Sequence, residues 1–180
     1  MEAKFSYHNH RPPHIFIVGY DYFITGRILD QQNLLAGAKK KIFLSVLKSK
    51  LIKYEYKCYA WVVLDNHYHI LIKTGDDGQI AEFIRELHAG SAKVINKNDG
   101  TKGRPVWYQY WDHGIRNKGD FIKHFNYIHH NPVKHHYVKY QDDVFDYQYC
   151  SYRQWVNKKG KGWVDSCFDE YSIIDFMAGE

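Results

Sequence analysis

The chain has 180 residues, of which 44% are hydrophobic and 17% aromatic, so its length and composition suit one domain with a real core. The formal net charge of +5 fits a polyanionic partner without requiring one. No apolar run approaches a membrane span, the N-terminus has no apolar signal core, and the three cysteines show no paired spacing. A membrane protein, a disulfide framework and a cysteine zinc site are therefore not indicated, and we expect a cytoplasmic protein.

The chain opens with an arm, a strand and a helix. Residues 1–14 are polar and are expected to form a flexible arm carrying Arg11 and His14. A strand is predicted over residues 22–28, in which Gly26 would mark a bulge or a close approach of two backbones. Residues 34–51 are predicted to form a helix, because apolar residues recur at helical spacing. The lysines of that helix lie mostly outside its apolar stripe, and we interpret them as a solvated face, with direct DNA contact as the alternative: Lys39, Lys40, Lys41, Lys48 and Lys50.

Residues 57–73 are predicted to form a β-hairpin. Its two-residue turn is Asp65-Asn66, two residues that tolerate the positive φ of a tight hairpin. Because side chains alternate along a strand, His67 and His69 face one way while Tyr68 faces a core. The two imidazoles would lie about 7 Å apart, as in half of a metal site. Two partly buried or surface histidines are the alternative.

A second helix is predicted over residues 79–96, with an apolar stripe at Ile80, Phe83, Ile84, Leu87 and Val94. It is preceded by a loop at residues 75–78. A flexible basic loop follows at residues 98–105 and carries Lys102 and Arg104. Residues 106–116 read as a strand or edge segment that ends at Arg116.

A third helix is predicted over residues 120–131, and the chain after residue 137 is expected to be loop-rich. Tyr127 and Asn131 are four residues apart, which places them on one flank of the helix, roughly 6 Å from each other. Pro132 predicts that the helix ends or kinks at Asn131. Helix capping is the alternative role for Asn131, and an amphipathic position at the edge of the core is the alternative for Tyr127.

The element order is strand, helix, strand, strand, helix, strand, helix. This order predicts an α+β, ferredoxin-like fold, with an antiparallel sheet, helices on one face and an extra C-terminal helix that bears the tyrosine. We expect three regions: the arm 1–14, the main domain 15–140, and a C-terminal extension 141–180 packed on the same domain.

These motifs resemble those of the single-tyrosine HUH transposases, named for His, a bulky hydrophobic residue and His, and within them the IS200-like, REP-associated tyrosine transposases. The matching segments run in family order over residues 15–155, and they are residues 61–72, 106–107, 127–133 and, more weakly, 151–155. Two residues depart from the family pattern. Tyr68 is more polar than the usual middle residue, and Asp65 replaces a proline that commonly precedes Asn-His.

The resemblance implies a function for the motif residues. His67, His69 and Asn131 would hold a divalent metal ion, Mg²⁺ or Mn²⁺, and Tyr127 would be the nucleophile. The enzyme would nick and rejoin single-stranded DNA next to a hairpin through a 5′-phosphotyrosine, as a monomer or homodimer associated with the nucleoid. Six basic residues are candidate DNA contacts by their position, with a solvated basic loop as the alternative: Arg11, His14, Lys102, Arg104, Arg116 and Arg153.

Two other functions remain open from the sequence. One is a catalytically silent, domesticated module that binds hairpin DNA or RNA on the same fold; the intact His-His-Tyr-Asn set argues against such decay. The other is an unrelated metal-dependent hydrolase. A hydrolase of that kind would need a carboxylate-rich site, and Asp65 is the only acidic residue beside either motif.

Overall fold

One four-stranded sheet organises the molecule. The computed structural model describes residues 19–75 and 79–176, so the arm 1–14 and most of the loop 75–78 lie outside the described residues. The sheet is antiparallel throughout, in the order β2-β3-β1-β4. Its strands are β1 (Asp21–Ile28), β2 (Lys57–Val63), β3 (His67–Lys73) and β4 (Trp107–Gly114).

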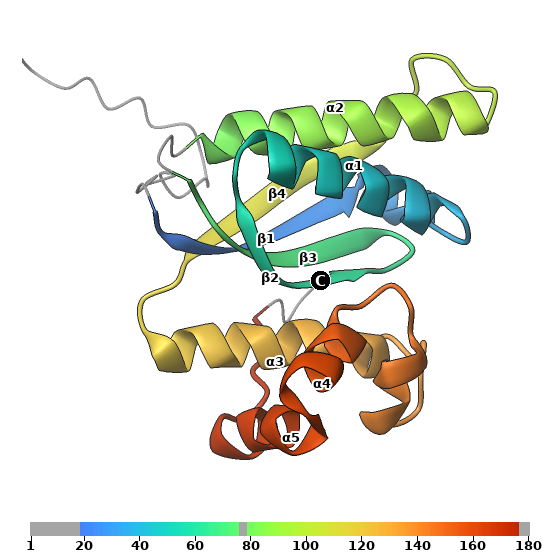
Figure 1. Ribbon diagram of the computed structural model, residues 1–180. Coiled ribbons are helices and arrows are strands. Elements are labelled where there is room, and N and C mark those ends of the chain that lie inside the picture. Colours follow the sequence, from blue (N-terminus) through green and yellow to red (C-terminus); the bar gives the residue numbers. More distant parts are fainter. Residues whose placement is uncertain (1–18, 76–78, 177–180) are drawn as a thin grey trace, which may run out of the picture.

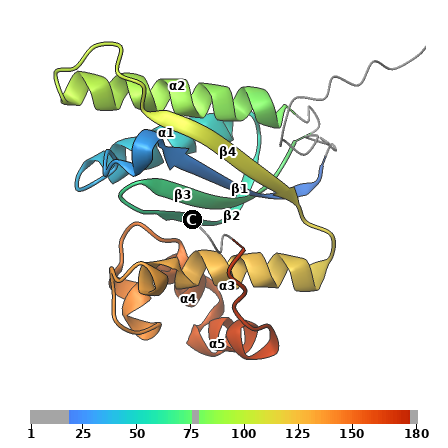
Figure 2. The same cartoon turned by 180° about the vertical axis from the view of Figure 1, so that it is seen from behind.

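Helices cover both faces of this sheet (Figures 1 and 2). On one face lie α1 (Lys39–Lys53) and α2 (Ile80–Asn98). On the other lie α3 (Lys118–Lys134), α4 (Tyr152–Lys159) and α5 (Lys161–Glu170). Two 3₁₀ turns, Leu29–Gln31 and Asp142–Asp146, complete the fold. The strand and helix order confirms the predicted ferredoxin-like α+β fold with an extra helix, α3.

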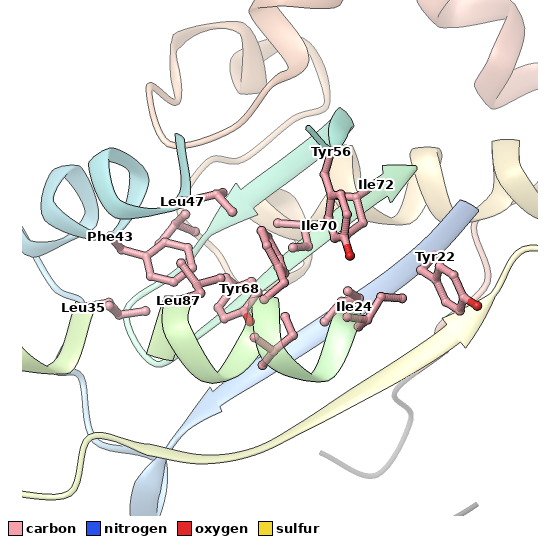
Figure 3. Close-up of a cluster of buried hydrophobic side chains, with 14 of the residues drawn as sticks. Tyr22, Ile24, Leu35, Phe43, Leu47, Tyr56, Tyr68, Ile70, Ile72 and Leu87 are labelled. Atoms are coloured by element: carbon pink, nitrogen blue, oxygen red, sulfur yellow. The ribbon is translucent and has the colours of Figure 1, made fainter. Parts of the chain in front are cut away.

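Strand alternation produces two cores, one on each face of the sheet. In the first core, Tyr68 and Ile70 of β3 pack under the helices, beside Phe43 of α1 and Leu87 of α2 (Figure 3). In the second core, Leu71 of β3 packs with side chains of α3. Strand β3 is therefore buried on both faces, and His69 lies on the face that α3 covers.

At Gly26 the predicted bulge is confirmed, whereas the close approach is made by a side chain and not by a second backbone. The β1–β4 register shifts between Gly26 and Ile28, as at a bulge. A Cβ atom on Gly26 would lie 2.6 Å from Cζ of Tyr68 in the neighbouring strand β3. Only glycine leaves room for the Tyr68 ring, whose hydroxyl oxygen lies 3.0 Å from Nε2 of His88.

The hairpin turn has the predicted length but a different backbone conformation. The Leu64 N–H donates to the His67 carbonyl at 2.9 Å, which closes a two-residue turn. Neither Asp65 nor Asn66 has a positive φ, so that part of the prediction is wrong. Neighbouring segments bind both turn residues: the Ile28 N–H donates to the Asn66 carbonyl at 2.8 Å, and the Asp65 N–H donates to the Tyr137 hydroxyl at 2.9 Å. These tertiary bonds outweigh the local preference for a positive-φ turn.

Lys40 corrects the interpretation of the first helix. The helix begins at Lys39 rather than residue 34. Lys40 is only 4% exposed, and its ammonium forms an ion pair with Asp65 and lies 4.9 Å from the centre of the Tyr137 ring. Lys40 is thus a buried partner of the hairpin turn and not part of a solvated face. Helical periodicity could not predict the burial of Lys40, because the Asp65 carboxylate that pairs with it lies 25 residues further along the chain.

The second and third helices also differ from their predictions. In α2, Val94 is 42% exposed and Ile95 takes the core position instead. Helix α3 continues through Pro132 to Lys134, so Asn131 is neither its last residue nor an N-cap. Pro132 lies within the last turn of the helix and has no N–H to donate, while its carbonyl accepts from the Tyr137 N–H at 2.8 Å.

The chain after residue 137 is more helical than expected. It contains α4 and α5, separated by Gly160 with φ of +87°. It also touches the sheet, because the Val63 N–H donates to the Tyr149 carbonyl and the Ser151 N–H donates to the Trp61 carbonyl, both at 2.9 Å. These bonds cover the outer edge of β2, which protects a strand that would otherwise expose unpaired amides.

Replacing Gly26 by alanine should destabilise the protein by about 1–3 kcal/mol, because the methyl group overlaps the Tyr68 ring. Urea denaturation followed by circular dichroism measures the free energy of unfolding. Gly162→Ala is the matched control. It lies in α5 with no atom within 4 Å of an added Cβ, so it should be neutral or stabilising. Equal stability of Gly26→Ala and the natural protein would contradict the close approach.

Candidate active site

His67 and His69 lie side by side beneath α3. Across the β1–β3 pairing, Arg27 is opposite His67 and Thr25 is opposite His69, so all four side chains share one face. The His67 and His69 ring centroids are 5.0 Å apart. His69 is fully buried and His67 is 7% exposed. The predicted histidine pair is therefore formed, in a site largely screened from water.

Both Nδ1 atoms are held by neighbouring oxygens. Nδ1 of His67 lies 2.6 Å from Oδ1 of Asn66, an oxygen that can only accept, so this nitrogen carries the proton. Nδ1 of His69 lies 2.7 Å from the Thr25 hydroxyl, and its Nε2 is buried without a partner among the described residues. Such contacts fix ring orientation in metal sites and leave Nε2 free to donate its lone pair.

Burial keeps both rings neutral. It lowers the pKa of His67 to about 3, with further lowering from His135 and Arg27. Burial likewise lowers the pKa of His69 well below its usual value, and the neighbouring His67 adds to the effect. Both imidazoles are thus unprotonated at neutral pH, which is the state in which they can bind a cation.

Asn131 of α3 completes a set of three donors. Its side chain is fully buried, and its Nδ2 donates to the Tyr127 carbonyl at 2.9 Å. Its Oδ1 is buried without a hydrogen-bond partner among the described residues. The Asn131 side chain is close enough to raise the pKa of both His67 and His69, against the larger lowering by burial. A buried, unpaired amide oxygen beside two neutral imidazoles fits a divalent cation with mixed nitrogen and oxygen ligands.

Tyr127 lies one helical turn before Asn131. Its ring is 5.2 Å from the His69 ring and its side chain is 2% exposed. The Lys134 ammonium donates to the Tyr127 hydroxyl at 3.3 Å and to Asp175 at 2.7 Å. Burial raises the pKa of Tyr127, and Lys134 opposes this shift. The Lys134 ammonium therefore favours the ionised form of the Tyr127 hydroxyl.

Thr25, Arg27 and Lys134 are site residues that the sequence reasoning missed. Lys134 had a usable signal, because it follows Tyr127 by seven residues and so by two helical turns. Thr25 and Arg27 had none, since their place opposite the histidines follows from the strand register.

The candidate DNA contacts are scattered. Arg11 and His14 lie outside the described residues. Lys102 and Arg116 are both exposed, but one precedes β4 and the other follows it, so they lie at opposite ends of that strand. An eight-residue strand separates its ends by roughly 25 Å. Lys102 and Arg116 thus do not belong to one compact basic patch.

Arg104 and Arg153 already have partners within the chain. Arg104 donates to Asn96 Oδ1 at 3.0 Å and to Asp99 at 2.6 Å, which ties the loop to the end of α2. Arg153 binds the Phe145 carbonyl at 2.7 Å and the Asp146 carboxylate at 2.9 Å. Both guanidinium groups therefore hold loops in place, whatever else they contact.

Comparison with known proteins identifies the class. The family model described as "Transposase IS200 like" matches residues 18–131, so the chain belongs to the IS200-like transposases. More particularly, it is 30% identical over 172 residues to the REP-associated tyrosine transposase of Escherichia coli strain K12, covering 92% of this chain and 93% of that protein. The protein is thus a transposase of the tyrosine type.

A solved structure agrees with this assignment. The structure of a REP-associated tyrosine transposase bound to a REP hairpin matches with a TM-score of 0.74 and 26% identity, covering 94% of this chain and 96% of that one. None of the described helices is long and apolar enough to cross a membrane. The predicted family and fold are therefore confirmed.

The buried histidines should make stability depend on pH. Each pKa is lower in the folded chain than in the unfolded chain, so the unfolded state binds more protons below about pH 6.5. The free energy of unfolding should be constant above that pH. It should fall as the pH drops toward 5, by up to about 1.4 kcal/mol per pH unit for each such group. The groups are His67, His69, His88, His124 and His129.

Urea titrations between pH 8 and 5 measure this slope. His129→Gln removes one buried imidazole and should reduce the slope below pH 6.5. His136→Gln, at an exposed position, is the control and should leave it unchanged. Stability that does not change over this pH range would show that the imidazoles are not buried in their neutral form.

Proposed function

We propose that the protein nicks and rejoins single-stranded DNA next to a hairpin, with Tyr127 as the nucleophile. The main support for this proposal is the packing of α3 against β3. Tyr127 and Asn131 of the helix lie against His67 and His69 of the strand, within one chain. The hairpin substrate is supported by the solved relative, which is bound to a REP hairpin. Acting on chromosomal DNA, the protein would work in the cytoplasm at the nucleoid.

His67, His69 and Asn131 would hold the divalent cation. Their donor set of two Nε2 atoms and one amide oxygen suits Mn²⁺ and admits Zn²⁺, Co²⁺ or Ni²⁺, while Mg²⁺ is favoured by its abundance. When bound, the cation would polarise the scissile phosphate and offset charge in the transition state. Thr25 and Asn66 would keep the two rings oriented for this task.

Tyr127 would supply the attacking oxygen. Its hydroxyl loses its proton and attacks phosphorus, the bond from phosphorus to the 3′ oxygen breaks, and that oxygen takes up a proton. The products are a 5′-phosphotyrosine and a free 3′-hydroxyl. The energy of the broken bond stays in the covalent intermediate, so rejoining needs no ATP.

Lys134 would favour ionisation of the nucleophile. A tyrosine hydroxyl has a pKa near 10 in water, and burial raises that of Tyr127 further. The Lys134 ammonium, 3.3 Å from the hydroxyl, stabilises the phenolate by a charge-assisted hydrogen bond. Lys134 also donates to Asp175. Partial burial lowers the pKa of Lys134, but its contacts with Asp175 and Tyr127 raise it by more, so the ammonium stays protonated.

The exposed basic residues Lys102 and Arg116 would contact phosphates, together with Arg11 and His14 of the arm. Arg104 and Arg153 each already bind a carboxylate and would add less net charge to the interface. Because the four site residues come from one chain, the arrangement supports a tyrosine that acts within its own subunit, as a monomer would need.

Tyr127→Phe should abolish the covalent protein–DNA adduct. The substitution removes one oxygen and keeps the ring, so it should cost at most about 1 kcal/mol of stability. The assay incubates the protein with labelled hairpin DNA and Mn²⁺ and detects a denaturation-resistant adduct on a gel. Peptide mass mapping then locates the modified tyrosine in the natural protein.

Tyr108→Phe is the matched control, since Tyr108 is 62% exposed and lies outside the site. It should form adduct at the normal yield. An adduct of normal yield in Tyr127→Phe, mapped to another tyrosine, would place the active site elsewhere. Hairpin binding by the natural protein without any adduct would instead support the silent binding module.

A further inference from the structure

A second group of metal-binding side chains lies where β4 passes into α3. It consists of His113 near the end of β4 and of Asp120 and His124 in the first turns of α3. One nitrogen of each imidazole and one carboxylate oxygen all lie within 4.8 Å of one another. We propose that His113, Asp120 and His124 form a second divalent-cation site, distinct from the His67–His69–Asn131 site.

Asp120 occupies the centre of this group. One of its carboxylate oxygens lies 3.0 Å from Nε2 of His113, and the other lies 3.2 Å from Nδ1 of His124. The Arg116 N–H donates to the first oxygen at 2.9 Å and fixes the carboxylate in place. The side chains of His113 and Asp120 are 22% and 17% exposed, so an ion can enter and water can complete its coordination.

His124 provides independent support for an ion-binding site, because one of its ring nitrogens is buried and unpaired among the described residues. Its side chain is fully buried, and its Nδ1 donates to the Asp120 carbonyl oxygen at 2.8 Å. Its Nε2 then carries a lone pair, and this atom is buried with no partner among the described residues. Burial lowers the pKa of His124 to about 4, so the ring is neutral and able to bind a cation. Unpaired buried nitrogens of this kind are rare in folded proteins.

The donor set selects the class of ion. Two imidazoles and one carboxylate suit Zn²⁺ and its neighbours Co²⁺ and Ni²⁺, whereas Mg²⁺ and Ca²⁺ prefer oxygen ligands alone. Binding would replace the hydrogen bond between Nε2 of His113 and the Asp120 carboxylate. The same three side chains would therefore hold either a hydrogen-bonded network or an ion.

The Phe23 ring contacts a histidine of each site. Phe23 of β1 has its centroid 5.4 Å from that of His69 on one side and 4.7 Å from that of His124 on the other. An ion on His113, Asp120 and His124 would fasten the start of α3 to the end of β4. Since Tyr127 follows His124 by three residues, such an ion would position the helix that carries the nucleophile.

The test uses the full chain, stripped with a chelator, in a His67→Ala/His69→Ala background that removes the first site. Isothermal titration with Zn²⁺ should show one ion bound per chain, and Co²⁺ should give a visible absorption band. Adding His113→Gln should weaken Zn²⁺ binding by more than about 100-fold, because even the loss of an outer-shell partner costs 10- to 100-fold. Adding His136→Gln, an exposed histidine of another segment, should change nothing.

A second comparison covers the case in which the double-alanine background does not fold. The natural protein should bind two Zn²⁺ ions, and the single His113→Gln variant should bind one. A single ion in the natural protein that is still bound by His113→Gln would overturn the proposal. So would two ions bound by His113→Gln, or the loss of an ion in His136→Gln instead, since that last result would assign the ion to surface histidines.

Discussion

Burial of β3 on both faces is the constraint on which the site depends. One face of this strand fills the core under α1 and α2, and the other presents His67 and His69 to α3. Desolvation keeps both imidazoles neutral, and it also makes an unpaired nitrogen or amide oxygen unfavourable. The helix that excludes water from the histidines is the helix that carries Tyr127 and Asn131. Folding and assembly of the site are therefore one event.

Orientation within the site comes from residues that are not expected to touch the substrate. Thr25 and Asn66 hold the Nδ1 atoms, and the turn that carries Asn66 is itself held by Ile28 and Tyr137. Lys134 links Tyr127, the proposed nucleophile, to Asp175 in the last described segment. A fold shared by many functions is thus specialised here through contacts between distant segments.

The sequence predicted the relative positions of site residues correctly where both residues lie on the same strand or the same helix. Period-2 alternation placed His67 and His69 on one face, and the four-residue spacing placed Tyr127 beside Asn131, as the structure has them. The strand and helix order was enough for the fold class. The failures lie where long-range contacts decide the outcome. The Asp65–Asn66 turn takes its conformation from tertiary bonds, and Lys40 is buried against a distant carboxylate. Helix α4 was missed because Tyr152 is its only buried residue, which leaves no apolar period to read.

The most direct test of this account is an anomalous-scattering map of crystals of the full chain loaded with Mn²⁺. We predict a peak within direct bonding distance of Nε2 of both His67 and His69, with Oδ1 of Asn131 as the third protein ligand. The Nδ1 atoms should keep their contacts to Asn66 and Thr25. A Mn²⁺ peak that lacks the two Nε2 atoms, or that leaves Asn131 oriented away from the ion, would contradict it.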